Sequence, residues 1–297
     1  MPFVELEQGT DEWKELRLSK IGGSDIAKIM GVSPYGTAYT LWQEKVGLVT
    51  IQETSAMRMG TETEEQIRSW YEKKTMDCYF PRVIISETHS FAMASLDGLS
   101  VDGKRILECK YCNKEVFKQV QDGQIPIHYL YQCQWQLLCT PSAEGVHFIC
   151  YNKALDDYAC AIIQRDEKII QDCVDKAQIF YENHIKTEIP PELSEDDYVI
   201  IDDETALILS EKLDSVMSVL SHLKKEEESL RQSLFSYSDD GNFICGNLKA
   251  SRCRGKKTFD YKKACEDNNI NMTKYEKKSI GFWRVSKISK EDEANDF

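Results

Sequence analysis

The spacing of apolar positions divides the chain into segments with helical and with strand-like periodicity. Apolar residues three or four positions apart mark helices, and short apolar runs bounded by turn residues mark strands. The predicted elements are helices within residues 10–48 and at about 61–74, 127–140 and 166–186, strands at 79–86, 147–151 and 158–165, and a strand hairpin at 91–111. This order of elements predicts an α/β (α+β) fold with a mixed central sheet flanked by helices.

A boundary is predicted where Pro190-Pro191 is followed by the acidic stretch Glu192–Glu204. Beyond it, Leu and Val recur with heptad spacing between residues 209 and 234, and Glu227 takes the one seam position that is not apolar. Such a seam can pair with another helix of the same chain or with a neighbouring copy. We expect a core at 1–190, an acidic linker with a heptad-patterned helix at 191–240, and a basic segment at 241–297.

Composition narrows the class of protein. The chain has 297 residues and a net charge of −13, and no apolar run reaches the roughly 18 residues of a membrane span. Its start does not resemble a signal peptide, and eleven scattered cysteines are more typical of reduced thiols than of a disulfide framework. We therefore expect a cytoplasmic protein, inside the host cell if it is viral. Residues 246–290 carry thirteen Lys and Arg against four Asp and Glu, so a polyanionic partner stays possible despite the acidic total.

The candidate chemistry lies in the hairpin. The dipeptide Asp102-Gly103 favours a two-residue turn. With the turn closed there, four side chains share one face of the hairpin as two facing pairs: Asp97 with Glu108, and Ser95 with Lys110. Facing carboxylates at roughly 5 Å repel, which destabilises the hairpin unless a cation stands between them. The spacing therefore predicts a hard-metal site beside a lysine.

Each of these residues also has an ordinary interpretation. An Asp before Gly is usually a turn residue, a lone Glu-x-Lys is usually a solvated strand edge, and a slip of one residue would separate the facing pair.

A divalent ion held by two acidic side chains can polarise a phosphodiester, and Lys110 can neutralise charge that develops on the phosphate. Asp on one strand and Glu-x-Lys on the next is the pattern of the PD-(D/E)xK nucleases, written here as Asp97 and Glu108-Cys109-Lys110.

Further motifs occur along the chain in a definite order. They are Leu16-Arg17-Leu18, Ile21–Asp25, Ser33-Pro34-Tyr35, Met59–Glu64, Tyr129–Leu137 and Arg165–Lys168. Together with the hairpin pattern, this set resembles the YqaJ viral recombinase family, which includes the phage lambda exonuclease. The resemblance covers about residues 8–185 and implies a PD-(D/E)xK, restriction-endonuclease-like core. Glu65 departs from the proline that members often carry, and the heptad helix and basic segment lie outside the match.

The resemblance implies a role for each matching residue. Metal coordination is implied for Asp97, Glu108, Glu64 and the main-chain carbonyl of Cys109. Catalysis is implied for the same three acids with Lys110 and Gln132. Contacts with a 5′-phosphate and the DNA are implied for Arg17, Ser24, Ser95, Tyr129 and Gln134.

Some of these residues have structural alternatives that the sequence leaves open. Glu64 could form a surface pair with Arg68 four residues later. Ser24 could cap a helix, a role compatible with phosphate binding. Gln132 and Tyr129 could be ordinary polar residues of the core.

The resemblance also implies an activity. It is a metal-dependent 5′→3′ exonuclease that degrades one strand of linear duplex DNA and leaves a 3′ overhang for phage-type recombination. One or two Mg²⁺ ions are implied, with Mn²⁺ able to substitute, as are a single-strand annealing protein as partner and a ring-like homo-oligomer, foremost a trimer. The alternatives are an endonuclease or RecB-type repair nuclease of the same fold, and a non-catalytic DNA-end-binding protein.

Overall fold

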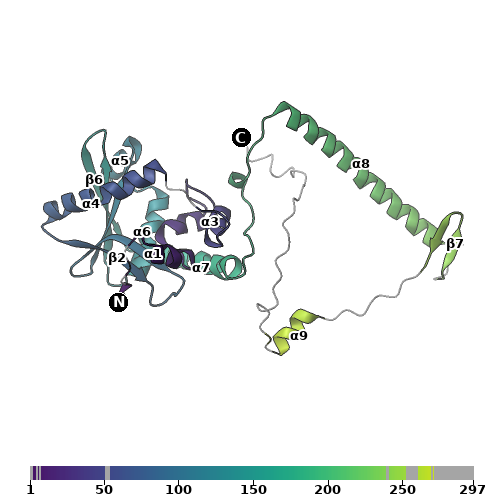
Figure 1. Cartoon of the computed structure of the whole chain (residues 1–297), viewed down its shortest axis with the longest axis horizontal. Helices are drawn as coiled ribbons and strands as arrows, with labels where there is room; N and C mark the ends of the chain where they lie inside the picture. The colour runs from purple at the N-terminus through teal and green to yellow at the C-terminus, as the bar shows by residue number, and fades with distance from the viewer. Residues whose placement is uncertain are drawn as a thin grey trace. The chain divides into compact units, whose positions relative to one another are not determined.

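The computed structural model of the chain describes residues 3–4, 6, 8–50, 54–238, 241–251, 260–268 and 270. The chain divides into two units, residues 1–199 and 200–297. The second unit contains α8 (Glu204–Phe235), the hairpin of β7 (Phe243–Cys245) and β8 (Leu248–Ala250), and α9 (Tyr261–Asp267) (Figure 1). Much of the predicted basic segment lies outside the described residues. No helix in the described ranges has the length and apolar character needed to cross a bilayer.

A six-stranded mixed sheet forms the centre of the first unit. Its strands follow one another in the sheet in chain order: β1 (Phe3–Val4), β2 (Tyr79–Ile85), β3 (Met93–Ser100), β4 (Arg105–Tyr111), β5 (Gly145–Asn152) and β6 (Asp157–Gln164). Neighbours pair antiparallel except β4 and β5, which are parallel. A parallel pair needs a crossover, here supplied by α5 (Lys114–Gln121) and α6 (Ile127–Cys139).

Helices cover both faces of this sheet and bury its apolar side chains (Figure 1). The remaining helices of the unit are α1 (Asp11–Leu18), α2 (Gly23–Ile29), α3 (Ala38–Lys45), α4 (Ser55–Thr75) and α7 (Glu167–Phe180). On one face Trp135 of α6 belongs to a core with Ile106 and Phe148 of the strands. On the other face Ile67 of α4 packs with Leu107. The predicted mixed-sheet α/β fold is confirmed.

Most predicted elements are present, and the differences have local causes. Helix α4 begins at Ser55, ahead of the predicted start, because Thr54 caps it by accepting the N–H of Met57, and Gly60 does not interrupt it. Helix α5 was not expected from the sequence. Only two of its eight residues, Phe117 and Val120, are buried, so its apolar signal is short.

The hairpin has the predicted register but a different turn. Gly98 pairs with Leu107 and Leu99 with Ile106, as the register centred on Asp102-Gly103 requires. The two-residue turn is wrong, however, because the N–H of Gly103 donates to the C=O of Ser100 at 2.9 Å. Of the turn's residues only Gly103 has a positive φ, +70°, whereas the favoured two-residue turn needs two such residues.

Glycine is required at position 98, where β2, β3 and β4 lie close together. A Cβ added there would lie 2.7 Å from the Cβ of Tyr79 and 3.2 Å from the Cβ of Leu107. We predict that Gly98→Ala lowers the free energy of unfolding by about 1–3 kcal/mol through overpacking. Gly60→Ala is the matched control, since a Cβ there meets nothing within 4 Å in a helix and should be neutral or stabilising. Chemical denaturation of both variants checks this, and equal effects would contradict it.

Candidate active site

The two strands of the hairpin separate at the candidate site. Counted from the turn, the paired register ends at Gly98 and Leu107, next to Asp97 and Glu108. Beyond that point side chains bind the backbone groups. The carboxylate of Asp97 accepts the N–H of Cys109 at 2.7 Å, and Arg68 of α4 donates to the C=O of Asp97 at 3.0 Å. The amide of Gln8 donates to the C=O of Leu96 at 3.2 Å. This opening gives the acidic side chains room within the sheet.

The carboxylate of Glu108 is buried and surrounded by nitrogen donors. Its side chain is 1% exposed, and Oε1 lies 2.5 Å from the ammonium of Lys110 and 2.5 Å from the amide nitrogen of Gln132. Oε2 accepts a hydrogen bond from the amide of Gln136. Lys110 and two amides therefore compensate the charge of the buried Glu108 carboxylate.

The remaining acids of this cluster hold their protons more strongly than usual. Burial, and then the negative charge of Glu108, raise the pKa of Asp97 well above its ordinary value. Burial also raises the pKa of Glu64, in part offset by Lys110. Burial opposes the charge of Lys110, but Glu108 and Asp97 outweigh it and raise the pKa of Lys110, which stays cationic.

A second group of polar residues lies where α1 ends and α2 begins. Arg17 donates to the hydroxyl of Ser24 at 2.8 Å. Arg17 also lies 3.6 Å from Asp25, which forms a buried ion pair with Lys45 at 2.6 Å. Despite its burial, Lys45 and then Arg17 hold the pKa of Asp25 at about 2. Gly22, and not Ser24, is the N-cap of α2, so the hydroxyl of Ser24 is available to face Arg17.

Trp13 joins this group to the hairpin, and the sequence did not predict a role for it in the site. Its indole N–H donates to the hydroxyl of Ser95 at 2.9 Å, and the guanidinium carbon of Arg17 lies 5.2 Å from the centre of its ring. Trp13 therefore fixes both residues on one wall. Its sequence signal was that of an apolar helix residue, which gives no hint of this bridge.

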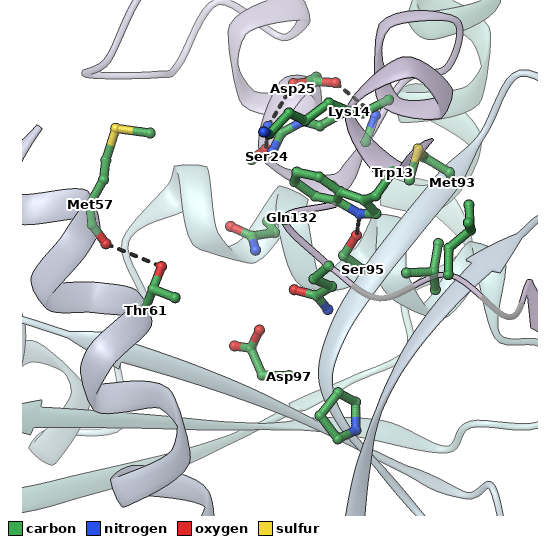
Figure 2. Close-up of a pocket in the computed structure, with 18 of the residues that line it drawn as sticks. Trp13, Lys14, Ser24, Asp25, Met57, Thr61, Met93, Ser95, Asp97 and Gln132 are labelled. Atoms are coloured by element: carbon green, nitrogen blue, oxygen red, sulfur yellow. Dashed lines mark hydrogen bonds and ion pairs between the residues drawn. The ribbon is translucent and has the colours of Figure 1, made fainter. Parts of the chain in front are cut away.

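Both groups line one cleft of about 1290 Å³. Figure 2 shows Asp97, Gln132, Ser95 and Trp13 around the same space, with Met57 and Thr61 of α4 opposite. The residues that line it include Trp13, Arg17, Ser24, Asp25, Lys45, Glu64, Ser95, Asp97, Glu108, Lys110 and Gln132.

Two residues with implied roles have other surroundings. Gln134 is buried, and its amide donates to the C=O of Gln164 and accepts the N–H of Asp166. The implied DNA contact of Gln134 is therefore wrong, because its hydrogen-bonding groups tie α6 to the start of α7. Tyr129 lies beside the cleft, with the ammonium of Lys110 5.5 Å from its ring centre.

The residues predicted to bind a metal ion fit that role in their chemistry but not in their grouping. In the part of the chain that the structure describes, no three Asp, Glu, His or Cys side chains are grouped so that they could hold a metal ion. The donors that line the cleft are nevertheless carboxylates, the ligands that Mg²⁺ and Mn²⁺ prefer. The thiol of Cys109 packs on the opposite face of the sheet, which leaves only its carbonyl as a candidate ligand. The residues fit a hard cation chemically, provided that Glu108 exchanges some of its nitrogen contacts.

Comparison with known proteins gives the family of this core. Residues 12–143 match the YqaJ-like viral recombinase domain. This part of the chain is therefore similar to the YqaJ-like viral recombinase domain. A relative, the uncharacterized protein YqaJ of Bacillus subtilis (strain 168), is 30% identical over 185 residues, which are 60% of this chain and 56% of the relative. The chain thus spans little more than half of that relative's length.

Solved structures of an exonuclease are similar to this core in fold and in sequence. An alkaline exonuclease from Laribacter hongkongensis has 26% sequence identity and a TM-score of 0.53, covering 60% of this chain and 96% of the exonuclease. The same exonuclease in complex with dAMP has 26% identity and a TM-score of 0.52 with the same coverage. The predicted family and the predicted fold of the core are confirmed.

The raised pKa of Asp97 predicts a pH-dependent stability difference. Between the unfolded value near 3.8 and its raised value, the folded protein binds more protons than the unfolded protein, so stability falls as pH rises. Asp97→Asn removes this term and can still accept the N–H of Cys109. In metal-free protein the variant should equal wild type near pH 4 and be more stable at pH 8, by about 1.4 kcal/mol for each pKa unit of the rise.

Thermal unfolding at several pH values measures this difference. Asp157→Asn, on an exposed part of β6, is the control and should show no such trend. A variant that is less stable than wild type at pH 8 would contradict the raised pKa of Asp97 in the folded protein.

Proposed function

We propose that this chain is a metal-dependent 5′→3′ exonuclease that acts on the ends of linear duplex DNA and leaves a 3′ single strand. The observation that carries the proposal is one cleft lined both by the Asp97, Glu108 and Lys110 cluster and by the Arg17 and Ser24 pair. The first can support phosphodiester hydrolysis, and the second presents a guanidinium and a hydroxyl to a terminal phosphate. The similarity to an alkaline exonuclease supports the same reaction class.

Each group has a distinct role in this proposal. Arg17, Ser24 and Ser95 bind the 5′-phosphate, and Trp13 holds two of them in place. Lys110 is cationic and neutralises charge that develops on the scissile phosphate. Gln132 keeps the Glu108 carboxylate oriented toward the cleft.

Carboxylates of Asp97, Glu108 and Glu64, with the carbonyl of Cys109, would hold the divalent ion. When bound, Mg²⁺ or Mn²⁺ polarises the phosphodiester and lowers the pKa of water. The raised pKa values of Asp97 and Glu64 fit this role, because a cation binds their deprotonated forms and so competes with protons. We further propose a single-strand annealing protein as partner and a ring-like homo-oligomer, foremost a trimer.

Removal of the Asp97 carboxyl or of the Lys110 ammonium should slow hydrolysis strongly. Asp97→Ala and Lys110→Ala should each lower the rate of nucleotide release from a 5′-phosphorylated linear duplex with Mg²⁺ by on the order of 10²-fold or more. Lys153→Ala, an exposed lysine outside the cleft, is the control and should keep the wild-type rate. Wild-type rates in the two cleft variants would overturn the assignment of Asp97 and Lys110 to the active site.

Other substrates test the alternative functions. Cleavage of closed circular DNA would favour an endonuclease, and end binding without turnover in Mg²⁺ or Mn²⁺ would favour a non-catalytic protein.

The phosphate site predicts a preference at the DNA end. Wild type should degrade a 5′-phosphorylated duplex faster than a 5′-hydroxyl duplex, because Arg17 and Ser24 form charge-assisted hydrogen bonds only with the phosphate. Arg17→Ala should remove most of this ratio, by about tenfold or more, and leave the rate on the 5′-hydroxyl end nearly unchanged. Equal losses on both ends would show instead that Arg17 serves the fold or the reaction itself.

A further inference from the structure

Helix α8 presents to solvent an apolar face that is interrupted at Glu227. It runs from Glu204 to Phe235, and none of its described residues is buried. Along one side, apolar residues follow heptad spacing with exposures between 46% and 64%: Leu209, Leu213, Val216, Leu220, Leu223 and Leu230. A single helix of this kind gains little from tertiary packing, so a partner that covers the face would stabilise it.

The heptad assignment identifies the residues that flank this face. The spacing places Leu209, Val216, Leu223 and Leu230 at d positions and Leu213, Leu220, Glu227 and Leu234 at a positions. Lys212, Val219 and Glu226 are then g positions, and Met217, Lys224 and Arg231 are e positions. Side chains at e and g set the orientation and register of the partner.

Glu227 argues against a parallel pair of identical helices. In a parallel dimer each a position packs beside the same position of the other chain, so two Glu227 carboxylates would meet in the seam. Like charges there are destabilising. In an antiparallel pair an a residue packs opposite a d residue, and the two Glu227 side chains lie far apart. Within its own helix Glu227 has Arg231 as partner at 2.7 Å.

One antiparallel register also matches the flanking charges. With Ser218 at the twofold axis, Leu213 packs opposite Leu223 of the second copy and Val216 opposite Leu220 of the second copy. Lys212 then lies beside Glu226 of the second copy, on both sides of the axis.

In the same register the other flanking residues also meet suitable partners on the second copy, both near the twofold axis and far from it. Val219 and Met217 each face their own counterparts at the centre, where apolar flanks extend the seam. Arg231 lies beside Asp203 of the second copy. In this register opposite charges therefore meet at the ends and apolar residues meet in the middle.

We propose that α8 pairs with α8 of a second copy of this chain as an antiparallel coiled coil centred on Ser218. The occupant of the exposed face is thus the same helix, and the pairing does not depend on the nuclease activity. Because α8 lies in the second unit, it links two chains through residues remote in sequence from the cleft residues.

A charge exchange tests both the pairing and its direction. In the full chain, Lys212→Glu should weaken association on the order of tenfold, because two attractive contacts become repulsive. Glu226→Lys should weaken it similarly, and the double variant should restore wild-type affinity. Lys225→Glu is the matched control, since the same change on the outer face of the helix should leave association unchanged. Analytical ultracentrifugation over a range of concentrations measures all four, and circular dichroism reports that each remains helical.

Alternative arrangements give different outcomes. In a parallel pair Glu226 would lie beside Arg231 of the second copy, so Glu226→Lys alone would weaken association and Lys212→Glu would not rescue it. That result would overturn the antiparallel register. Leu213→Asp should abolish the pairing between α8 helices and leave the proposed ring intact, so an unchanged association state in Leu213→Asp would overturn the pairing itself. Wild-type nuclease activity is expected in every variant, which keeps this test separate from that of the proposed function.

Discussion

The burial of the Glu108 carboxylate is the constraint around which the cleft is arranged. A carboxylate with 1% exposure is tolerated only when its charge is compensated, and here one ammonium and two amide groups do so. These donors come from β4 itself and from two positions one turn apart on α6. The sheet and the helix that covers it are therefore joined by a polar contact at the site and by apolar packing elsewhere.

The nitrogen donors of the cleft surround Glu108, whereas Asp97 has fewer of them. The two carboxyl groups therefore differ in how strongly their negative charge is compensated. Asp97 has the N–H of Cys109 as a donor, but its burial, and then the charges of Glu108 and Glu64, raise its pKa. The carboxylate of Glu108 is thus held by nitrogen donors, and the carboxyl of Asp97 is ready to exchange a proton for a cation. The divergence of β3 and β4 creates this difference, because it frees backbone groups that Asp97 and Arg68 then bind.

The sequence predicted the hairpin register, and with it the shared face of Ser95, Asp97, Glu108 and Lys110, because side-chain alternation on strands follows directly from register. The other cleft residues, Arg17, Ser24, Glu64 and Gln132, were implied by the family resemblance and not by the register. The prediction from sequence failed where helical geometry was overlooked. Gln132 and Gln136 are four residues apart and share one helix face, whereas Gln134 points elsewhere, so helical spacing alone would have favoured Gln136 as the partner of Glu108. The bridge made by Trp13 depends on contacts 82 residues apart and has no local signal.

We propose that Glu108 is held by nitrogen donors and exchanges some of them for a divalent cation that Asp97 also binds. The most direct measurement is anomalous diffraction at the manganese edge from crystals grown with Mn²⁺, compared with metal-free crystals at the same pH. The account predicts a strong anomalous peak beside Asp97 and Glu108 and a movement of Lys110 away from Glu108. Full manganese occupancy elsewhere, with the contacts of Glu108 unchanged and no peak beside Asp97, would contradict it.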